Sequence, residues 1–224
     1  MSSPNHTYSD QLRALKEHYS ERAIEHGDSA PATNWPDRES QERRLEILCS
    51  IADLSEASIL DFGCGTGHLL TYLREKHCFE GTYTGVDICP EMIEIAGRKF
   101  PEDVFECRDI LAEPIREKSF DYVMVSGVFN NRVEDNWGMM KEILSGLFPL
   151  CRKGLAFNNL STFVDFFAED LFYVDPCEVF RFCKENLSPL VSIRHDYLSK
   201  PDTVPFEFTT FVYASELKPR QRKG

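Results

Sequence analysis

The stretch Ile59–Leu70, with the sequence ILDFGCGTGHLL, decides how this chain is interpreted. A short apolar run leads directly into Gly63, Gly65 and Gly67, and a helical pattern follows. Glycines at such a turn let the backbone bend sharply and approach a ligand closely, where a Cβ atom would collide. The dinucleotide motif G-x-G-x-x-G would need its third glycine at position 68, which is His68. The spacing therefore predicts a loop for a nucleotide-type cofactor and disfavours NAD.

The segment Asp61–Gly67 resembles the first motif of the class I, Rossmann-like methyltransferases that use S-adenosylmethionine (SAM), in which an acidic residue precedes G-x-G-x-G. Tyr83–Asp87 is a second apolar run, and its final carboxylate follows the glycines by about 20 residues, where such folds hold ribose hydroxyls. The family also tends to place an acidic residue after its third strand, facing the adenine amine, and Asp109 stands there. The resemblance covers roughly residues 40 to 160 and implies a SAM-dependent methyltransferase.

The resemblance implies cofactor contacts from several parts of the chain. Asp87 is expected to bind the ribose, although capping the helix that starts at Pro90 is an alternative role. Asp61 could orient the glycine loop, reach the SAM amino group, or be a buried structural carboxylate. The N-terminal segment of such enzymes often closes over SAM. The expected cofactor-binding residues are Tyr19, Trp35, Arg44, Asp61, Gly63, Cys64, Gly65, Gly67, Asp87, Ile88, Met92, Asp109, Ile110 and Ser126.

The composition is that of a globular, acidic protein. The 224 residues carry a formal net charge of −12 and are 42% hydrophobic, enough for one domain with a substantial core. The acidity opposes binding to nucleic-acid phosphates. The eight cysteines include no C-x-x-C pair and are expected to be reduced. The sequence shows no secretion signal and no apolar run of membrane-spanning length. We therefore expect a cytoplasmic protein that binds neither nucleic acid nor membrane.

Strand-like and helical runs alternate along the chain, which predicts a parallel sheet with helices on both faces. Helical patterns are expected at 8–26, from a cap at Asp37, and at 67–76, 90–99, 135–149, 163–172 and 175–186. Strands are expected at 57–62, 82–87, 103–107, 120–126, 153–158, 189–197 and 206–213. By the resemblance, these form a Rossmann-like α/β sheet of seven strands whose last strand is antiparallel.

We expect a single methyltransferase domain spanning residues 1–224. Residues 1–54 would form an N-terminal helical cap, within which 8–36 could be a lid or part of the core. Residues 55–214 would form the SAM-binding core. Residues 215–224 would be a disordered basic tail.

Methyl transfer from SAM depends on aligning donor and acceptor, so a dedicated catalytic residue is optional. Ligands of open α/β sheets bind beyond the carboxyl ends of the strands. This rule selects four expected substrate residues, Phe129, Asn130, Asn131 and Asn158. His195, at the end of the sixth strand, is a candidate general base, although a structural role is an alternative. The ends of strands four and five offer no carboxylate suited to a hard cation, so we expect no metal.

These patterns predict methyl transfer to a small molecule through oxygen, nitrogen or carbon. Three alternatives stay open. The first is a SAM-binding or regulatory protein without turnover, and the second is a methyltransferase of basic proteins. The third is arsenic methylation, which would need converging cysteines among Cys64, Cys89 and Cys107. The aromatic run after strand five could wall an apolar acceptor pocket or belong to the core. The sequence leaves the acceptor and the oligomeric state open.

Overall fold

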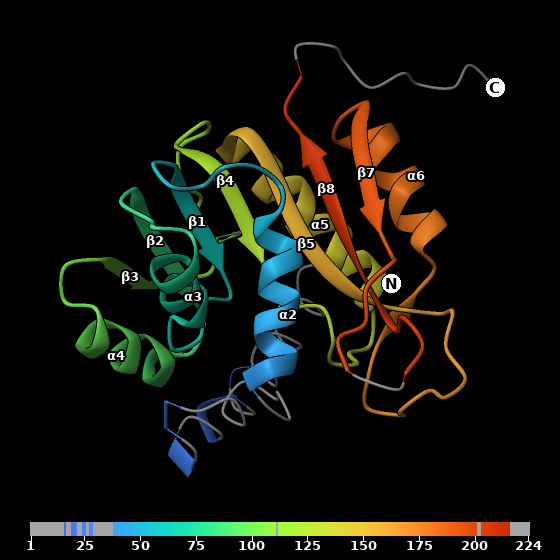
Figure 1. Cartoon of the computed structure of the whole chain (residues 1–224), viewed down its shortest axis with the longest axis horizontal. Coiled ribbons are helices and arrows are strands. Elements are labelled where there is room, and N and C mark those ends of the chain that lie inside the picture. The colour runs from blue at the N-terminus through green and yellow to red at the C-terminus, as the bar shows by residue number, and fades with distance from the viewer. Residues whose placement is uncertain are drawn as a thin grey trace.

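The computed structural model describes residues 16, 19–21, 24–25, 27–28, 38–110, 112–200 and 203–215. Its centre is one sheet with the strand order β3-β2-β1-β4-β5-β8-β7, in which β6 also pairs with β5 (Figure 1). The strands are β1 (Ser58–Phe62), β2 (Thr82–Asp87), β3 (Val104–Cys107), β4 (Phe120–Val125), β5 (Cys151–Ser161), β6 (Tyr173–Val174), β7 (Leu190–Arg194) and β8 (Glu207–Tyr213). Only β8 runs antiparallel to its neighbours, β5 and β7. The predicted Rossmann-like α/β fold is confirmed, with the short β6 as an addition.

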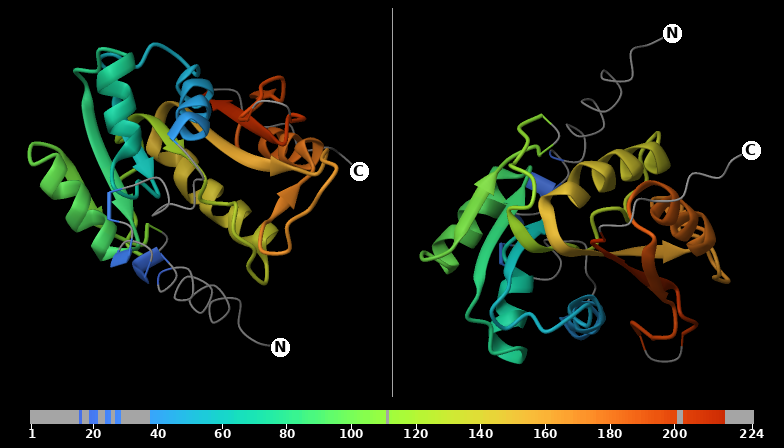
Figure 2. Two further views of the ribbon diagram at one scale, coloured as in Figure 1. Left: turned by 60° about the horizontal axis from the view of Figure 1, so that its bottom comes forward. Right: turned by 90° about the horizontal axis from the view of Figure 1, so that it is seen from above.

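Helices cover both faces of this sheet, as the view from above in Figure 2 shows. The described helices are α2 (Arg38–Cys49), α3 (His68–Lys76), α4 (Pro90–Lys99), α5 (Asn136–Leu147) and α6 (Pro176–Asn186), with a 3-10 turn, η2, at Phe148–Leu150. Helices α2 and α3 pack on one face, α5 and α6 on the other, and α4 packs against β2 and β3. The side chains of Asp135 and Asp175 cap α5 and α6 by accepting backbone N–H groups.

The central strands are buried on both faces, as expected for strands covered by helices on each side. Successive residues of β4 show this alternation. Val123 and Val125 are fully buried against α5 and α6, whereas Tyr122 and Met124 face α2 and α3. The core therefore has two layers, one on each side of the sheet.

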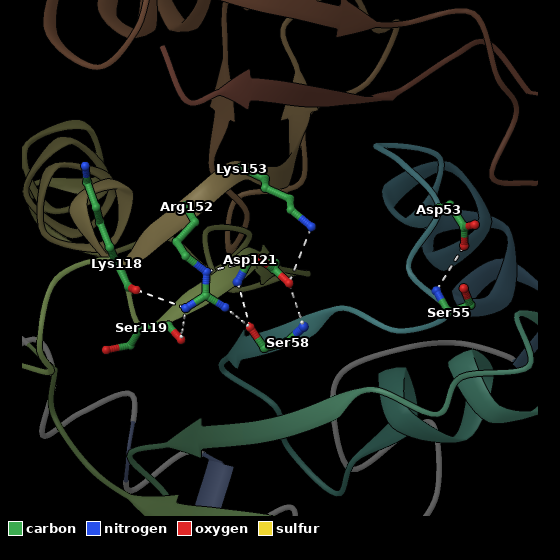
Figure 3. A network of polar contacts seen from close by, with 8 residues as sticks. All are labelled: Asp53, Ser55, Ser58, Lys118, Ser119, Asp121, Arg152 and Lys153. Carbon is green, nitrogen blue, oxygen red and sulfur yellow. Dashed lines mark hydrogen bonds and ion pairs between the residues drawn. The ribbon is translucent and has the colours of Figure 1, made fainter. Parts of the chain in front are cut away.

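A polar network ties together the amino ends of β1, β4 and β5 (Figure 3). The Arg152 guanidinium donates to Asp121 Oδ1 at 3.0 Å and to Ser58 Oγ at 2.6 Å, and it also reaches the carbonyls of Lys118 and Ser119. Ser58 and Asp121 further bond each other through their backbone N–H groups. Burial opposes ionisation of Asp121, but these hydrogen bonds and Arg152 leave its pKa below the ordinary value. The network fixes the strand ends opposite the carboxyl edge, where ligands are expected.

The helix predicted over residues 163–172 is wrong. This segment is a loop, and its backbone bonds pair it with the segment after β4: Phe172 N donates to Asn130 O at 2.8 Å, and Arg132 N to Asp170 O at 2.9 Å. Tyr173–Val174 then pairs with the end of β5 as β6. The aromatic residues have helical spacing, but pairing with distant strands and loops outweighs this local signal.

Most of the predicted N-terminal helix, and Trp35, lie outside the described residues. Of that segment, residues 16, 19–21 and 24–25 are helical. Apart from this segment and residues 163–172, the predicted helices are present within a few residues of their expected bounds. Helix α4 begins and ends where the pattern placed it.

Candidate cofactor site

A cavity opens at the carboxyl ends of β1, β2, β3 and β4, the lower edge of the sheet in Figure 1. Its position beyond the carboxyl ends of the strands is where open α/β sheets bind their ligands. Ten of the predicted cofactor residues line it, namely Tyr19, Asp61, Gly63, Cys64, Gly65, Asp87, Ile88, Met92, Asp109 and Ser126. The structure thus brings together residues that are far apart in the sequence.

Some lining residues were missed by sequence reasoning. Leu45 comes from α2, while Met139 and Ile143 come from α5. Their apolar or neutral side chains fit ordinary core spacing, so no local signal marks them. Arg108, next to the predicted Asp109, also lines the cavity and pairs with Glu106 at 2.9 Å.

The glycine loop is a tight left-handed turn pinned to β2. Gly63 N and Cys64 N both donate to the Val86 carbonyl, at 2.8 and 3.1 Å. Gly63 has a φ of +75°, and a Cβ added there would lie 2.3 Å from Val128 Cγ2. At Gly67 the φ is +80° and a Cβ would lie 2.9 Å from the Phe100 ring. Both positions need glycine for conformation and packing, and Gly67 lies outside the cavity lining.

Asp87 links the glycine loop to α4. Its Oδ2 accepts a hydrogen bond from Gly65 N, and its Oδ1 accepts one from Cys89 N, both at 2.9 Å. Burial raises the pKa of Asp87, and the backbone donors partly oppose this shift. Cys89 is the N-cap residue of α4 and its side chain makes no cap hydrogen bond, while Asp87 bonds the Cys89 N–H rather than an N–H of the first turn. Asp87 therefore holds the entry to α4 without capping the helix. Because a carboxylate can accept about four hydrogen bonds, capacity remains for ribose hydroxyls.

Asp61 is a buried carboxylate at the end of β1. Tyr83 Oη donates to its Oδ2 at 2.5 Å, and only 3% of the residue is exposed. Burial raises the pKa of Asp61 to about 7, and the neighbouring Asp87 raises it further, against the effect of Tyr83. A cation in the cavity would therefore favour the ionised form of this side chain.

The region expected to hold adenine is only partly polar. Asp109 and Ile88 line the cavity, and Met92, 1% exposed, lines it while packing against Cys89. Ile110 is a core residue, 3% exposed, outside the lining. Asp109 therefore lines the cavity and Ile110 does not, and the contact of either residue with adenine stays a prediction.

The N-terminal segment contacts both sides of the cavity. Tyr19 lines it, and Asn131 Nδ2 donates to Tyr19 Oη at 2.6 Å. The next residue, Ser20, donates its hydroxyl to Glu91 on α4 at 2.7 Å. Tyr19 therefore bridges the cofactor cavity and the segment after β4, as a covering segment would.

Arg44 and His195 also lie away from the cavity lining. Arg44 Nε binds both carboxylate oxygens of Glu207, at 2.5 and 2.6 Å, and the two side chains are only 3% and 2% exposed. His195 Nε2 lies 2.8 Å from the Pro205 carbonyl, and its ring packs near Phe163. A role of Arg44 at the cofactor, and of His195 as a base, stays a prediction.

The predicted substrate residues are placed differently from one another. Phe129 is 1% exposed and packs edge-on against Phe157 in the core. Asn158 Oδ1 accepts a hydrogen bond from Gly127 N at 2.8 Å, which fixes the turn after β4. Asn130 and Asn131 are half-buried on that turn.

The described residues contain no group of three or more His, Cys, Asp or Glu side chains that could hold a metal ion. Nor is any helix among them long and apolar enough to cross a bilayer.

The fold and the cavity together define a Rossmann-like protein with a nucleotide-type cofactor site, and comparisons with known proteins specify it further. Residues 59–149 match the family model described as "Methyltransferase domain". The chain is 38% identical over 146 residues to "Putative methyltransferase Rv1506c" of Mycobacterium tuberculosis, an alignment that covers 62% of this chain and 86% of that protein. It therefore belongs to the class I SAM-dependent methyltransferases.

Two further comparisons agree. The demethylmenaquinone methyltransferase of Lactococcus lactis is 32% identical over 111 residues, which is 47% of this chain and 44% of that protein. Magnesium protoporphyrin IX methyltransferase from Synechocystis, solved with bound S-adenosylhomocysteine (SAH), has the same fold at a TM-score of 0.66 and 15% identity, over 92% of this chain and all of that one. This protein is thus a SAM-dependent methyltransferase, and its cofactor is SAM.

Proposed function

We propose that this enzyme methylates a small organic molecule at an oxygen, nitrogen or carbon atom. The observation that carries the proposal is the position of Tyr19, which lines the cavity and is bonded to Asn131, so this side chain narrows the site between the glycine loop and the turn after β4. Such a site suits a compact acceptor better than a protein segment or a nucleic-acid strand, and the net charge of −12 disfavours nucleic acid further. The menaquinone and porphyrin enzymes named above also act on small molecules by their names.

The side chains that line the cavity fit SAM. Asp87 retains acceptor capacity toward two ribose hydroxyls while holding Gly65 and Cys89 in place. Asp61 provides a buried carboxyl group that the ammonium group of the methionine moiety would hold in its ionised form. Asp109 faces the same cavity and suits the adenine amine. When bound, SAM supplies an electrophilic methyl carbon and a sulfonium leaving group.

The acceptor would be aligned by the turn after β4. Asn158 holds Gly127 through its Oδ1, and Ser126, Gly127 and Val128 line the cavity. The buried Nδ2 of Asn158 has no hydrogen-bond partner among the described residues. Asn158 itself lies outside the cavity lining, so its effect on the acceptor would pass through the turn that it holds. Alignment of donor and acceptor is the main contribution that methyl transfer requires from the protein.

Transfer of labelled methyl groups tests the proposal. The full chain would be incubated with methyl-labelled SAM and either the low-molecular-mass or the macromolecular fraction of an extract from the expression host, after mass spectrometry of co-purified ligands. We expect label in the small-molecule fraction and none with Asp87→Ala. Label confined to protein or nucleic acid would overturn the proposal. The free thiols of all eight cysteines agree with our further proposal that the enzyme works in the cytoplasm.

A further inference from the structure

The loop between β5 and β6, residues 162–172, exposes three phenylalanines to solvent. Phe163, Phe166 and Phe167 are 62%, 75% and 50% exposed. Leaving such side chains in water forfeits the free energy that their burial would gain. Several large apolar groups in one short exposed segment indicate a binding surface rather than scattered surface residues. We call this segment the aromatic loop.

The aromatic loop is continuous with the wall of the cofactor cavity. Its end is fixed to the turn after β4 by Phe172 N donating to Asn130 O, and by Arg132 N donating to Asp170 O. Asn131, between these two anchors, bonds Tyr19, which lines the cavity. In Figure 1 the loop lies at the lower edge of the sheet, beside the connection between β7 and β8. The aromatic loop and the cavity therefore share the turn after β4 as a common support.

The aromatic loop is also acidic. Asp165, Glu169 and Asp170 are exposed, and residues 162–175 contain no lysine or arginine. Arg132 lies beside the loop, with its Nε toward the Leu171 carbonyl at 3.4 Å. The faces of phenyl rings attract cations, and nearby carboxylates add to that attraction. The same carboxylates repel anions, so an apolar ligand with a positive charge fits this surface better than a fatty acid or a phosphorylated compound.

We propose that the aromatic loop binds the apolar, positively charged part of the methyl acceptor, which makes the substrate class an amphipathic amine or quaternary ammonium compound. The charged group lies among the carboxylates of the loop, and the atom to be methylated reaches the cavity beside Gly127. This inference rests on the proposed function, because it assigns the loop to the acceptor of that same site.

Calorimetric titration of the full chain saturated with SAH tests the inference. The probes are octyltrimethylammonium, 1-octanol and octanoate, which share one chain length and differ in charge. Octyltrimethylammonium should bind about tenfold more tightly than octanoate, with octanol between them. The double variant Phe166→Ser/Phe167→Ser should weaken octyltrimethylammonium binding about tenfold. Phe180→Ser, at a 39% exposed phenylalanine on α6, is the matched control and should not change it.

Failure of this inference is distinguishable from failure of the proposed function. Equal binding of the three probes, preference for octanoate, or unchanged binding in the double variant would each overturn the assignment of the aromatic loop. The SAH affinity of the double variant should equal that of the wild type, and thermal denaturation checks that it is folded. In the methyl-transfer assay, label found only on macromolecules would instead refute the proposed function itself.

Discussion

Replacing Asp87 should weaken cofactor binding more than any other single carboxylate change. Its two oxygens each accept one backbone N–H, from Gly65 and Cys89, at 2.9 Å. Each oxygen keeps room for a second bond, so two ribose hydroxyls can donate to it. A hydrogen bond to a charged group contributes about 1.5–3 kcal/mol, so Asp87→Ala removes about 3–6 kcal/mol before water compensates. We therefore expect at least a tenfold rise in the dissociation constant.

Calorimetry with SAH measures this change directly. Asp87→Asn should lie between the wild type and Asp87→Ala, because the amide keeps one acceptor oxygen but turns an NH₂ group toward a backbone N–H. Glu94→Ala is the control and should bind SAH normally, because Glu94 is an exposed carboxylate on α4 that pairs with Arg98, away from the cavity lining. An affinity of Asp87→Ala within about threefold of the wild type would refute the ribose assignment.

Four further changes have definite expected outcomes. Gly63→Ala should destabilise the fold by about 1–3 kcal/mol, because its Cβ would lie 2.3 Å from Val128 Cγ2. Gly97→Ala, whose Cβ would have nothing within 4 Å, should stabilise α4 by up to about 1 kcal/mol. Urea denaturation measures both free energies of unfolding, and equal effects would contradict the reasoning. Burial raises the pKa of Asp61 from 3.8 to about 7, so between these pH values the folded state holds a proton that the unfolded chain releases. The free energy of unfolding of the wild type should therefore fall, relative to that of Asp61→Asn, as pH rises from about 4 to about 7. Free energies of unfolding that change with pH in the same way in both proteins would contradict this. Tyr19→Phe should raise the dissociation constant of SAH about 2- to 10-fold by removing the bond to the segment after β4, and no change would assign Tyr19 another role. EDTA should leave methyl transfer intact, and activity restored by magnesium would show that a metal is used.

The features that the sequence predicted correctly depend on residues close together along the chain. The glycine turn after β1 needs left-handed backbone at Gly63, Gly65 and Gly67, which only glycine adopts readily. Helix α4 starts at Pro90, where the missing N–H costs nothing, and runs to Lys99 as expected. Because such preferences act over a few residues, they can be interpreted without knowing the fold.

The segment after β5 shows where this local reasoning fails. Phe163–Phe172 has aromatic residues at helical spacing, yet the chain there is a loop paired with residues 130–132. Periodicity cannot distinguish a buried helical stripe from exposed aromatic side chains on a loop, because both give the same pattern of residue types. The short strand Tyr173–Val174 depends on β5 extending to Ser161, which no local signal indicates.

Partners of the site side chains were decided only by the tertiary structure. Arg44 and Glu207 are 163 residues apart, and Tyr19 and Asn131 are 112 apart. The sequence alone determined that a cationic residue, Arg44, stands on α2 and that a carboxylate, Asp87, ends β2. That Arg44 meets Glu207 follows from the strand order, because β8 lies beside β5 and brings Glu207 under α2. Contacts of this kind require the whole sheet to form, so they cannot be derived from any short stretch of the chain.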